Sequence, residues 1–131
     1  MADVLIVDDD LDTAELLGEL LQLAGHTTRV ANDGTKGMAL LHARTPDVVV
    51  LDVEMPMLTG PEMALQMFFQ DRGLEDVPIV LCSGALDLEE LAERVGTKYF
   101  IAKPYDAAAL LTLIELAHAE RIPPRYRPEA F

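Results

Sequence analysis

The stretch VVVLD, residues 48–52, consists of four apolar residues followed at once by an acid. Three of the four are β-branched, and no polar residue interrupts them. This pattern predicts a short strand buried on both faces, as in a parallel sheet covered by helices. A second run of the same kind, VLIV at residues 4–7, is also followed by acids. The sequence therefore predicts two buried strands that each end in carboxylates.

Working outward from these runs, strands and helices are predicted to alternate along the whole chain. The predicted strands cover residues 4–7, 27–30, 48–51, 79–82 and 99–102, and apolar residues at helical spacing follow each of them. Asp12 and Glu15 have the N-cap and N3 spacing of a first helix, Pro61 suits a first helical turn, and Asp106 opens the last helix. A turn is predicted at residues 32–34. Five successive βα units predict a single-domain α/β fold, a (βα)5 three-layer sandwich.

The acids at the strand ends favour one strand order. Two doubly wound orders accommodate such units, and in the flavodoxin-like order 2-1-3-4-5 strands 1 and 3 are neighbours. Ligands of such sheets bind where the carboxyl ends of the strands meet at the switch point. Asp8 and Asp9 follow the first strand, and Asp52 ends the third. The order 2-1-3-4-5 therefore brings these three side chains together.

Composition limits the classes of protein that fit. The 131 residues suit one domain, and 23 acidic against 10 basic residues give a formal charge of −13, which opposes nucleic-acid binding. The sequence has neither an apolar run of about 20 residues nor a basic leader, so we expect a cytoplasmic protein without a membrane span. Cys82 is the only cysteine, which excludes an internal disulfide, and it is predicted to be a buried strand residue.

The predicted cluster has the chemistry of a phosphoryl-transfer site. Adjacent carboxylates repel one another unless a cation lies between them, and Mg²⁺ prefers carboxylate and water oxygens. Asp8, Asp9 and Asp52 supply such oxygens, and Asp52 is the candidate nucleophile. Phosphoryl transfer also needs positive charge and a hydrogen-bond donor near the transferred group. Lys103 and Ser83, at the ends of the fifth and fourth predicted strands, are the candidates.

These motifs together resemble a known family. Asp8-Asp9, the segment LDVEMP at residues 51–56 with Gly60, Ser83-Gly84 and Lys103-Pro104 are similar, in order and separation, to the motifs of two-component response regulator receiver domains of the chemotaxis type. The resemblance covers roughly residues 3 to 119. It implies a phosphoprotein of phosphorelay signalling that catalyses its own phosphorylation and dephosphorylation and is not otherwise an enzyme.

The resemblance also implies a role for each site residue. Asp52 would accept a phosphoryl group from a histidine kinase or a phosphotransfer protein. Asp9, Asp52 and the backbone carbonyl of Glu54 would bind Mg²⁺ directly, with Asp8 acting mainly through water. Ser83 would bond the phosphoryl group, and Lys103 would pair with it.

A switch is implied as well. Phe100, three residues before the lysine, matches the position of the family's rotating aromatic residue, and Ser83 is its partner in the switch. Tyr99 lies one step earlier, so the sequence leaves open which ring switches. An output partner or a second copy of the chain would bind the face formed by the fourth helix, fifth strand and fifth helix, roughly residues 86–95 and 99–119.

The remaining expectations concern the chain ends and the alternatives. We expect a receiver domain over residues 1–120 and a tail or the start of a linker over residues 121–131. His26, His42 and His118 match no motif and are expected at the surface. Two other functions remain open: an aspartyl phosphatase of the haloacid dehalogenase kind with Asp8 as nucleophile, and a protein-interaction module that is never phosphorylated.

Overall fold

The computed structural model describes residues 1–70 and 73–127. Strands and helices alternate along the chain as predicted. The elements are β1 (Asp3–Val7), α1 (Leu11–Leu23), β2 (Thr27–Ala31), α2 (Gly34–Ala43), β3 (Val48–Asp52), α3 (Gly60–Phe69), the 3-10 helix η1 (Leu74–Asp76), β4 (Ile79–Ser83), α4 (Leu88–Val95), β5 (Tyr99–Ala102) and α5 (Ala107–Glu120). The predicted α/β class is therefore confirmed.

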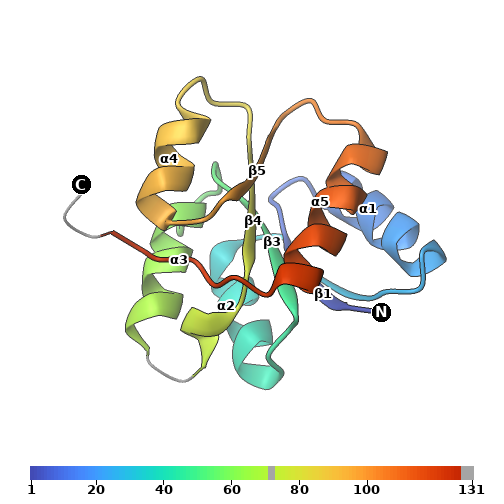
Figure 1. Cartoon of the computed structure of the whole chain (residues 1–131), viewed down its shortest axis with the longest axis horizontal. Helices are drawn as coiled ribbons and strands as arrows, with labels where there is room; N and C mark the ends of the chain where they lie inside the picture. Colours follow the sequence, from blue (N-terminus) through green and yellow to red (C-terminus); the bar gives the residue numbers. More distant parts are fainter. Residues whose placement is uncertain (71–72, 128–131) are drawn as a thin grey trace.

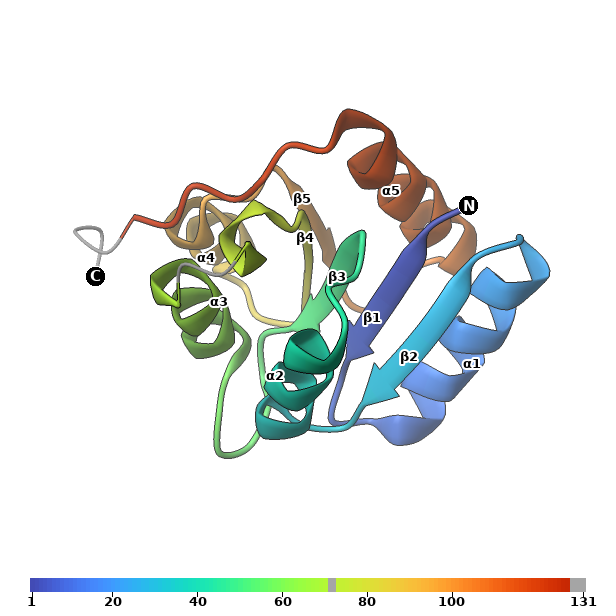
Figure 2. The same cartoon turned by 90° about the horizontal axis from the view of Figure 1, so that it is seen from below.

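The five strands form one parallel sheet in the order β2-β1-β3-β4-β5, which confirms the predicted 2-1-3-4-5 order. The central pairing sets Val7 of β1 beside Leu51 of β3. This register puts the residues that follow β1 next to Asp52. Helices α1 and α5 cover one face of the sheet, and α2, α3 and α4 cover the other (Figures 1 and 2). The fold is thus a three-layer sandwich.

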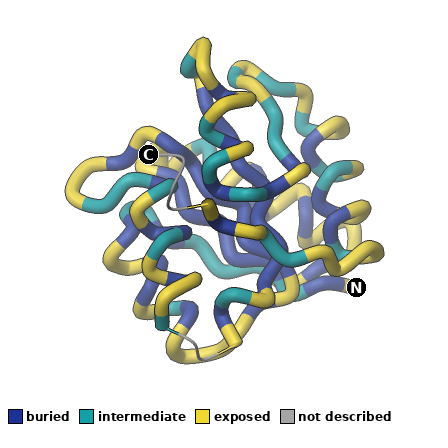
Figure 3. Tube along the Cα trace, turned by 60° about the vertical axis from the view of Figure 1, so that its left-hand side comes forward, coloured by how far each residue is buried: buried dark blue, intermediate teal, exposed yellow. Residues whose placement is uncertain are grey.

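The alternation of side chains along the strands divides the core into two clusters, one on each face of the sheet. Leu5 and Val49 join the cluster beneath α2, α3 and α4, whereas Val4 and Val50 join the cluster beneath α1 and α5. All residues of β3 and β4 are buried. Figure 3 shows these strands as the buried centre, with exposed residues on the outer turns and loops. The site therefore stands at the end of a rigid sheet.

Two helix starts differ from the sequence prediction. Helix α1 is capped by Asp10, whose side chain accepts hydrogen bonds from the backbone N–H and the hydroxyl of Thr13, so the predicted cap at Asp12 is wrong. Asp10 has extended backbone angles immediately before Leu11, the first helical residue, and this places its side chain to cap the helix. Asp33 likewise caps α2, so the predicted turn at residues 32–34 is the helix start. The expected position of Pro61 in the first turn of α3 is confirmed.

The loop from β3 to α3 folds back against the end of β3. The N–H of Gly60 donates to the carbonyl of Val53, and a Cβ at Gly60 would overlap the backbone carbonyl oxygen of Asp52. Only glycine leaves room for this approach. Gly60 thereby fixes the backbone on which the Asp52 side chain stands.

His26 is buried, so its expected surface position is wrong. Its Nδ1 accepts a hydrogen bond from the backbone N–H of Ala2, and its Nε2 lies 3.4 Å from a carboxylate oxygen of Glu115. The ring thus ties the start of β1 to the α1–β2 loop and to α5. His42 is exposed as expected, and His118 is half-buried.

Cys82 is buried in β4 as predicted, and burial raises the pKa of its thiol to about 12. Such a thiol stays protonated and unreactive near neutral pH. Among the described residues, no helix combines the length and apolar character needed to cross a membrane.

Candidate functional site

The predicted site residues meet at the carboxyl edge of the sheet. Asp8 and Asp9 follow β1, Asp52 ends β3, Ser83 ends β4, and Lys103 follows β5. Backbone hydrogen bonds connect these strand ends, including one of 2.8 Å from the N–H of Lys103 to the carbonyl of Ser83. The sheet itself therefore holds all five side chains at one rim.

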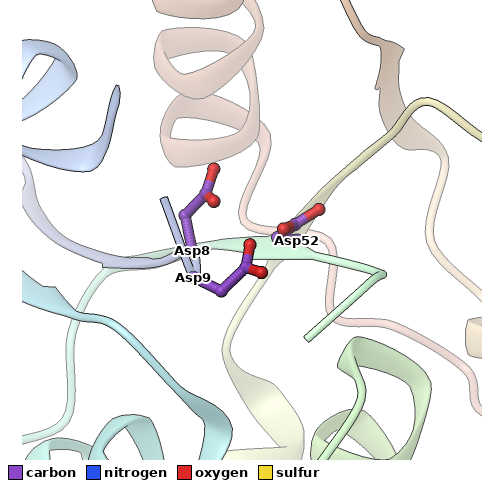
Figure 4. A group of neighbouring side chains, drawn as sticks. All are labelled: Asp8, Asp9 and Asp52. Carbon is purple, nitrogen blue, oxygen red and sulfur yellow. The ribbon is translucent and has the colours of Figure 1, made fainter. Parts of the chain in front are cut away.

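Three carboxylates form the centre of this rim. One oxygen from each of Asp8, Asp9 and Asp52 lies within 4.8 Å of the others. Asp8 and Asp52 are buried, whereas Asp9 is exposed. Figure 4 shows the three side chains gathered beside the ends of β1 and β3. Asp8 also accepts a hydrogen bond of 2.9 Å from the N–H of Asp10, which fixes its orientation.

Lys103 is the cation of the site. Its Nζ lies 3.2 Å from Oδ2 of Asp8 and 3.2 Å from Oδ1 of Asp52. Burial opposes the charged ammonium, but the carboxylates of Asp52 and Asp8 outweigh it and raise the pKa of Lys103 above its usual range. One lysine therefore pairs with two of the three acids, and among the described residues of the cluster the carboxylates outnumber the cation.

Burial and the neighbouring negative charge both shift the pKa of Asp52. Burial, and secondly the charge of Asp8, raise the pKa of Asp52 to about 7, although Lys103 acts in the opposite direction. Among the described residues, Oδ1 of Asp52 makes no hydrogen bond of good geometry, even though its distance to Lys103 suits an ion pair. A buried carboxylate oxygen without a directed hydrogen bond still lacks part of its normal solvation.

The donor set fits Mg²⁺. This hard cation takes carboxylate, carbonyl and water oxygens, and it usually keeps several waters while binding one or two carboxylates. The site offers the buried acids Asp8 and Asp52, the exposed acid Asp9 and an incompletely solvated oxygen. The exposure of Asp9 leaves an open side from which a hydrated ion can enter.

Ser83 has a partner that the sequence did not predict. Its Oγ donates a 2.5 Å hydrogen bond to Oε1 of Glu54, and the N–H of Ala85 donates to the same Oγ. Ser83 is fully buried, whereas Glu54 is exposed. The acidic side chain two residues beyond Asp52 thus occupies the hydroxyl expected to bind a phosphoryl group. In the sequence, the only indication of this contact was that Glu54 lies two residues after Asp52, in the loop that follows β3.

The two candidate switch rings lie on opposite faces of the sheet. Tyr99 is buried in the cluster beneath α1 and α5, and its hydroxyl donates a 2.6 Å hydrogen bond to Glu120. Phe100 is half-buried and packs against the cluster beneath α4. It pairs with Leu81 in β4, two residues before Ser83, so Phe100 and Ser83 point to the same face.

The fold and the rim together define a class of protein: a flavodoxin-like α/β domain with a cluster of three carboxylates that could hold a metal ion, and with a lysine and a serine at the switch point. Comparison with known proteins identifies the family. Residues 4–115 match the family model described as "Response regulator receiver domain". The chain belongs to this family, whose general function is phosphorylation on an aspartate.

Individual proteins of known sequence or structure are similar to this chain over most of its length. Protein Rrf1 of Nitratidesulfovibrio vulgaris is 35% identical over 90% of this chain and 83% of its own length. The solved receiver domain of NtrX from Brucella abortus has a TM-score of 0.78 at 32% identity, covering 89% of this chain and 98% of that one. The chemotaxis protein CheY4 of Vibrio cholerae has a TM-score of 0.80 at 28% identity, covering 88% and 98%.

Other relatives are longer than this chain. The DNA-binding regulator RpaA of Synechocystis is 28% identical over 94% of this chain but only 52% of its own length. For Response regulator MprA of Mycobacterium ulcerans the identity is 33%, over 82% of this chain and 46% of the relative. The chain thus spans about half the length of several curated relatives.

Membership of the receiver-domain family decides against the alternative of an aspartyl phosphatase of the haloacid dehalogenase kind.

Proposed function

We propose that this chain is a phosphorylation-dependent signalling switch in which Asp52 accepts the phosphoryl group. The observation that carries the proposal is the buried carboxylate of Asp52 at the switch point, 3.2 Å from Lys103 and beside Asp8 and Asp9. An oxygen of Asp52 attacks phosphorus, the bond from phosphorus to the donor breaks, and an acyl phosphate forms on Asp52. The donor is a histidine kinase or a phosphotransfer protein.

The other residues of the rim neutralise the charge of the transferred group. Asp9, Asp52 and the backbone carbonyl of Glu54 would hold Mg²⁺, with Asp8 acting through water. The ion would supply positive charge to the phosphoryl oxygens. Lys103 pairs with the same oxygens, and the hydroxyl of Ser83 donates a hydrogen bond to them once it leaves Glu54. The domain thereby promotes its own phosphorylation and dephosphorylation.

Phosphorylation would change the surface formed by α4, β5 and α5. Moving Ser83 toward the phosphoryl group displaces the loop that leads to α4, and space vacated on that face admits the ring of Phe100. Phe100 is preferred to Tyr99 as the switch ring because it shares a face with Ser83. The partner that binds this surface is an output protein or a second copy of the chain, and we place the system in the cytoplasm.

Amide NMR shifts test the switch. Beryllofluoride, a stand-in for the phosphoryl group, is added with Mg²⁺, and shifts are compared with those of the protein with Mg²⁺ alone. We expect changes at the rim and also along α4 and β5, because a two-state repacking reaches beyond the site. Changes limited to the rim would instead support an interaction module that does not switch.

Replacing Glu54 by alanine should speed phosphoryl uptake. The Glu54 carboxylate holds the hydroxyl of Ser83 at 2.5 Å, and it places negative charge where an anionic donor approaches. Removing it frees Ser83 and reduces repulsion, so we expect uptake from acetyl phosphate with Mg²⁺ to rise several-fold, as expected for the loss of about 1 kcal/mol of opposing interaction. Quenched-flow or intact-mass time courses measure the rate.

Glu54→Gln is the matched control. It keeps a side chain that can accept the Ser83 hydrogen bond but removes the charge. An uptake rate between those of the wild type and Glu54→Ala supports both effects. A rate in Glu54→Ala equal to or below that of the wild type would show that the Glu54–Ser83 contact does not restrain the site.

A further inference from the structure

The tail after α5 makes specific contacts with the opposite face of the sheet. It leaves α5 on one face and reaches α4 and α3 on the other (Figures 1 and 2). The N–H of Arg125 donates to the carbonyl of Gly96, and the N–H of Arg127 donates to the carbonyl of Arg94. These carbonyls lie at the C-terminal end of α4, where helices have unpaired acceptors. We call residues 121–127 the strap.

Tyr126 anchors the strap. Its side chain is only 8% exposed and belongs to the core cluster beneath α2, α3 and α4. Its ring lies 6.0 Å from the ring of Phe68 in α3. The guanidinium of Arg127 also lies 3.8 Å from the carboxylate of Glu93 in α4, an exposed pair that adds little. The strap therefore bridges the ends of α3 and α4 chiefly through a buried ring.

Gly96 is adapted to this contact. It ends α4 in the left-handed conformation at φ 80°, and a Cβ there would overlap the backbone of Arg125. The first requirement is common at helix ends, but the second comes from the strap alone. The close backbone approach shows that the strap is packed into the fold.

The other end of α4 is held less firmly. Asp87, its N-cap, makes no side-chain capping hydrogen bond, and the preceding loop contains the exposed Leu86 and leads back to Ser83. A groove of about 510 Å³ runs between α4, β5 and the strap, lined among others by Ala92, Phe100 and Arg125. The strap thus borders the same ring and the same helix that the proposed switch moves.

We propose that the strap is an intramolecular brake, which holds α4 in the arrangement where Ser83 is bonded to Glu54. This inference rests on the proposed function, because it assigns the strap to regulation of that site. A contact that stabilises one of two states opposes every ligand that prefers the other, and the coupling is reciprocal. Docking of the strap therefore weakens binding of the phosphoryl group, and phosphorylation loosens the strap.

Two variants release the strap by different means. Tyr126→Ala removes the buried ring, and Arg125→Pro removes the N–H that bonds Gly96 while keeping Tyr126. Ile122→Ala, at an exposed strap position, is the matched control. Each protein with its full chain is titrated with beryllofluoride in the presence of Mg²⁺, and hydrogen exchange of the α4 amides is measured without beryllofluoride.

We expect both strap variants to bind beryllofluoride several-fold more tightly than the wild type, with faster exchange in the last turn of α4, by about tenfold or more. Ile122→Ala should match the wild type in both measurements. If Tyr126→Ala does not fold, Arg125→Pro decides alone. Unchanged affinity in the folded strap variants would overturn the brake, whether or not exchange accelerates. Failure of the wild type itself to bind beryllofluoride would overturn the proposed function. Binding by the wild type, with the same affinity in the strap variants, would overturn only the brake.

Discussion

Asp52→Asn abolishes the uptake of a phosphoryl group from acetyl phosphate in the presence of Mg²⁺. The amide lacks the nucleophilic oxygen, so no acyl phosphate forms, and we expect the uptake rate to fall by at least about a thousandfold. Intact-mass measurement over time follows the reaction. The wild type should gain one phosphoryl group under the same conditions.

Asp10→Asn is the matched control for this substitution. It makes the same chemical change two residues from Asp8, but Asp10 serves as the N-cap of α1, a role that asparagine performs well. Uptake should therefore stay close to that of the wild type. Undiminished uptake in Asp52→Asn would show that another side chain is the acceptor.

The second large effect is on stability in the absence of Mg²⁺. The pKa of Asp52 rises from 3.8 to about 7 on folding, so the native state binds more protons than the unfolded state between these values. This group therefore lowers the free energy of unfolding as pH rises from about 4 to about 7, by roughly 3 to 4 kcal/mol relative to Asp52→Asn. Urea denaturation of both proteins at intervals from pH 4 to pH 8 measures the difference.

Mg²⁺ should reverse this loss in the wild type. A ligand that binds only the native state stabilises it, by about 2.7 kcal/mol at a concentration 100 times its dissociation constant. The gain at pH 8 should be much smaller in Asp52→Asn and in Asp9→Asn, because each substitution removes one expected ligand. A pH profile identical in the wild type and in Asp52→Asn, or an equal Mg²⁺ gain in all three, contradicts this account of the acidic rim.

The layout of the fold and the rim could be predicted because the signals are local. Continuous apolar runs such as residues 48–51 predict buried parallel strands. An acid directly after such a strand must lie at the carboxyl edge of the sheet. Asp9 follows the first predicted strand and Asp52 ends the third, and this favoured the strand order in which these two strands are neighbours. Lys103 could be placed on the same rim for the same reason.

Features that depend on tertiary contacts could not be predicted in this way. His26 is buried because Ala2 and Glu115 come from segments distant in sequence, and no local pattern distinguishes it from a surface histidine. Tyr126 lies among prolines and arginines, which predict an exposed tail, and only the aromatic ring itself hinted at burial. The Glu54–Ser83 hydrogen bond likewise joins the loop after β3 to the end of β4, 29 residues apart in sequence.

The measurement that tests the central claim most directly is the location of the phosphoryl group in the wild-type chain. The protein is phosphorylated with acetyl phosphate and Mg²⁺, digested at low pH and mapped by tandem mass spectrometry. We predict that the group is found on Asp52, in the peptide that contains the end of β3. A phosphoryl group on Asp8 or Asp9, in the peptide that follows β1, would contradict the account.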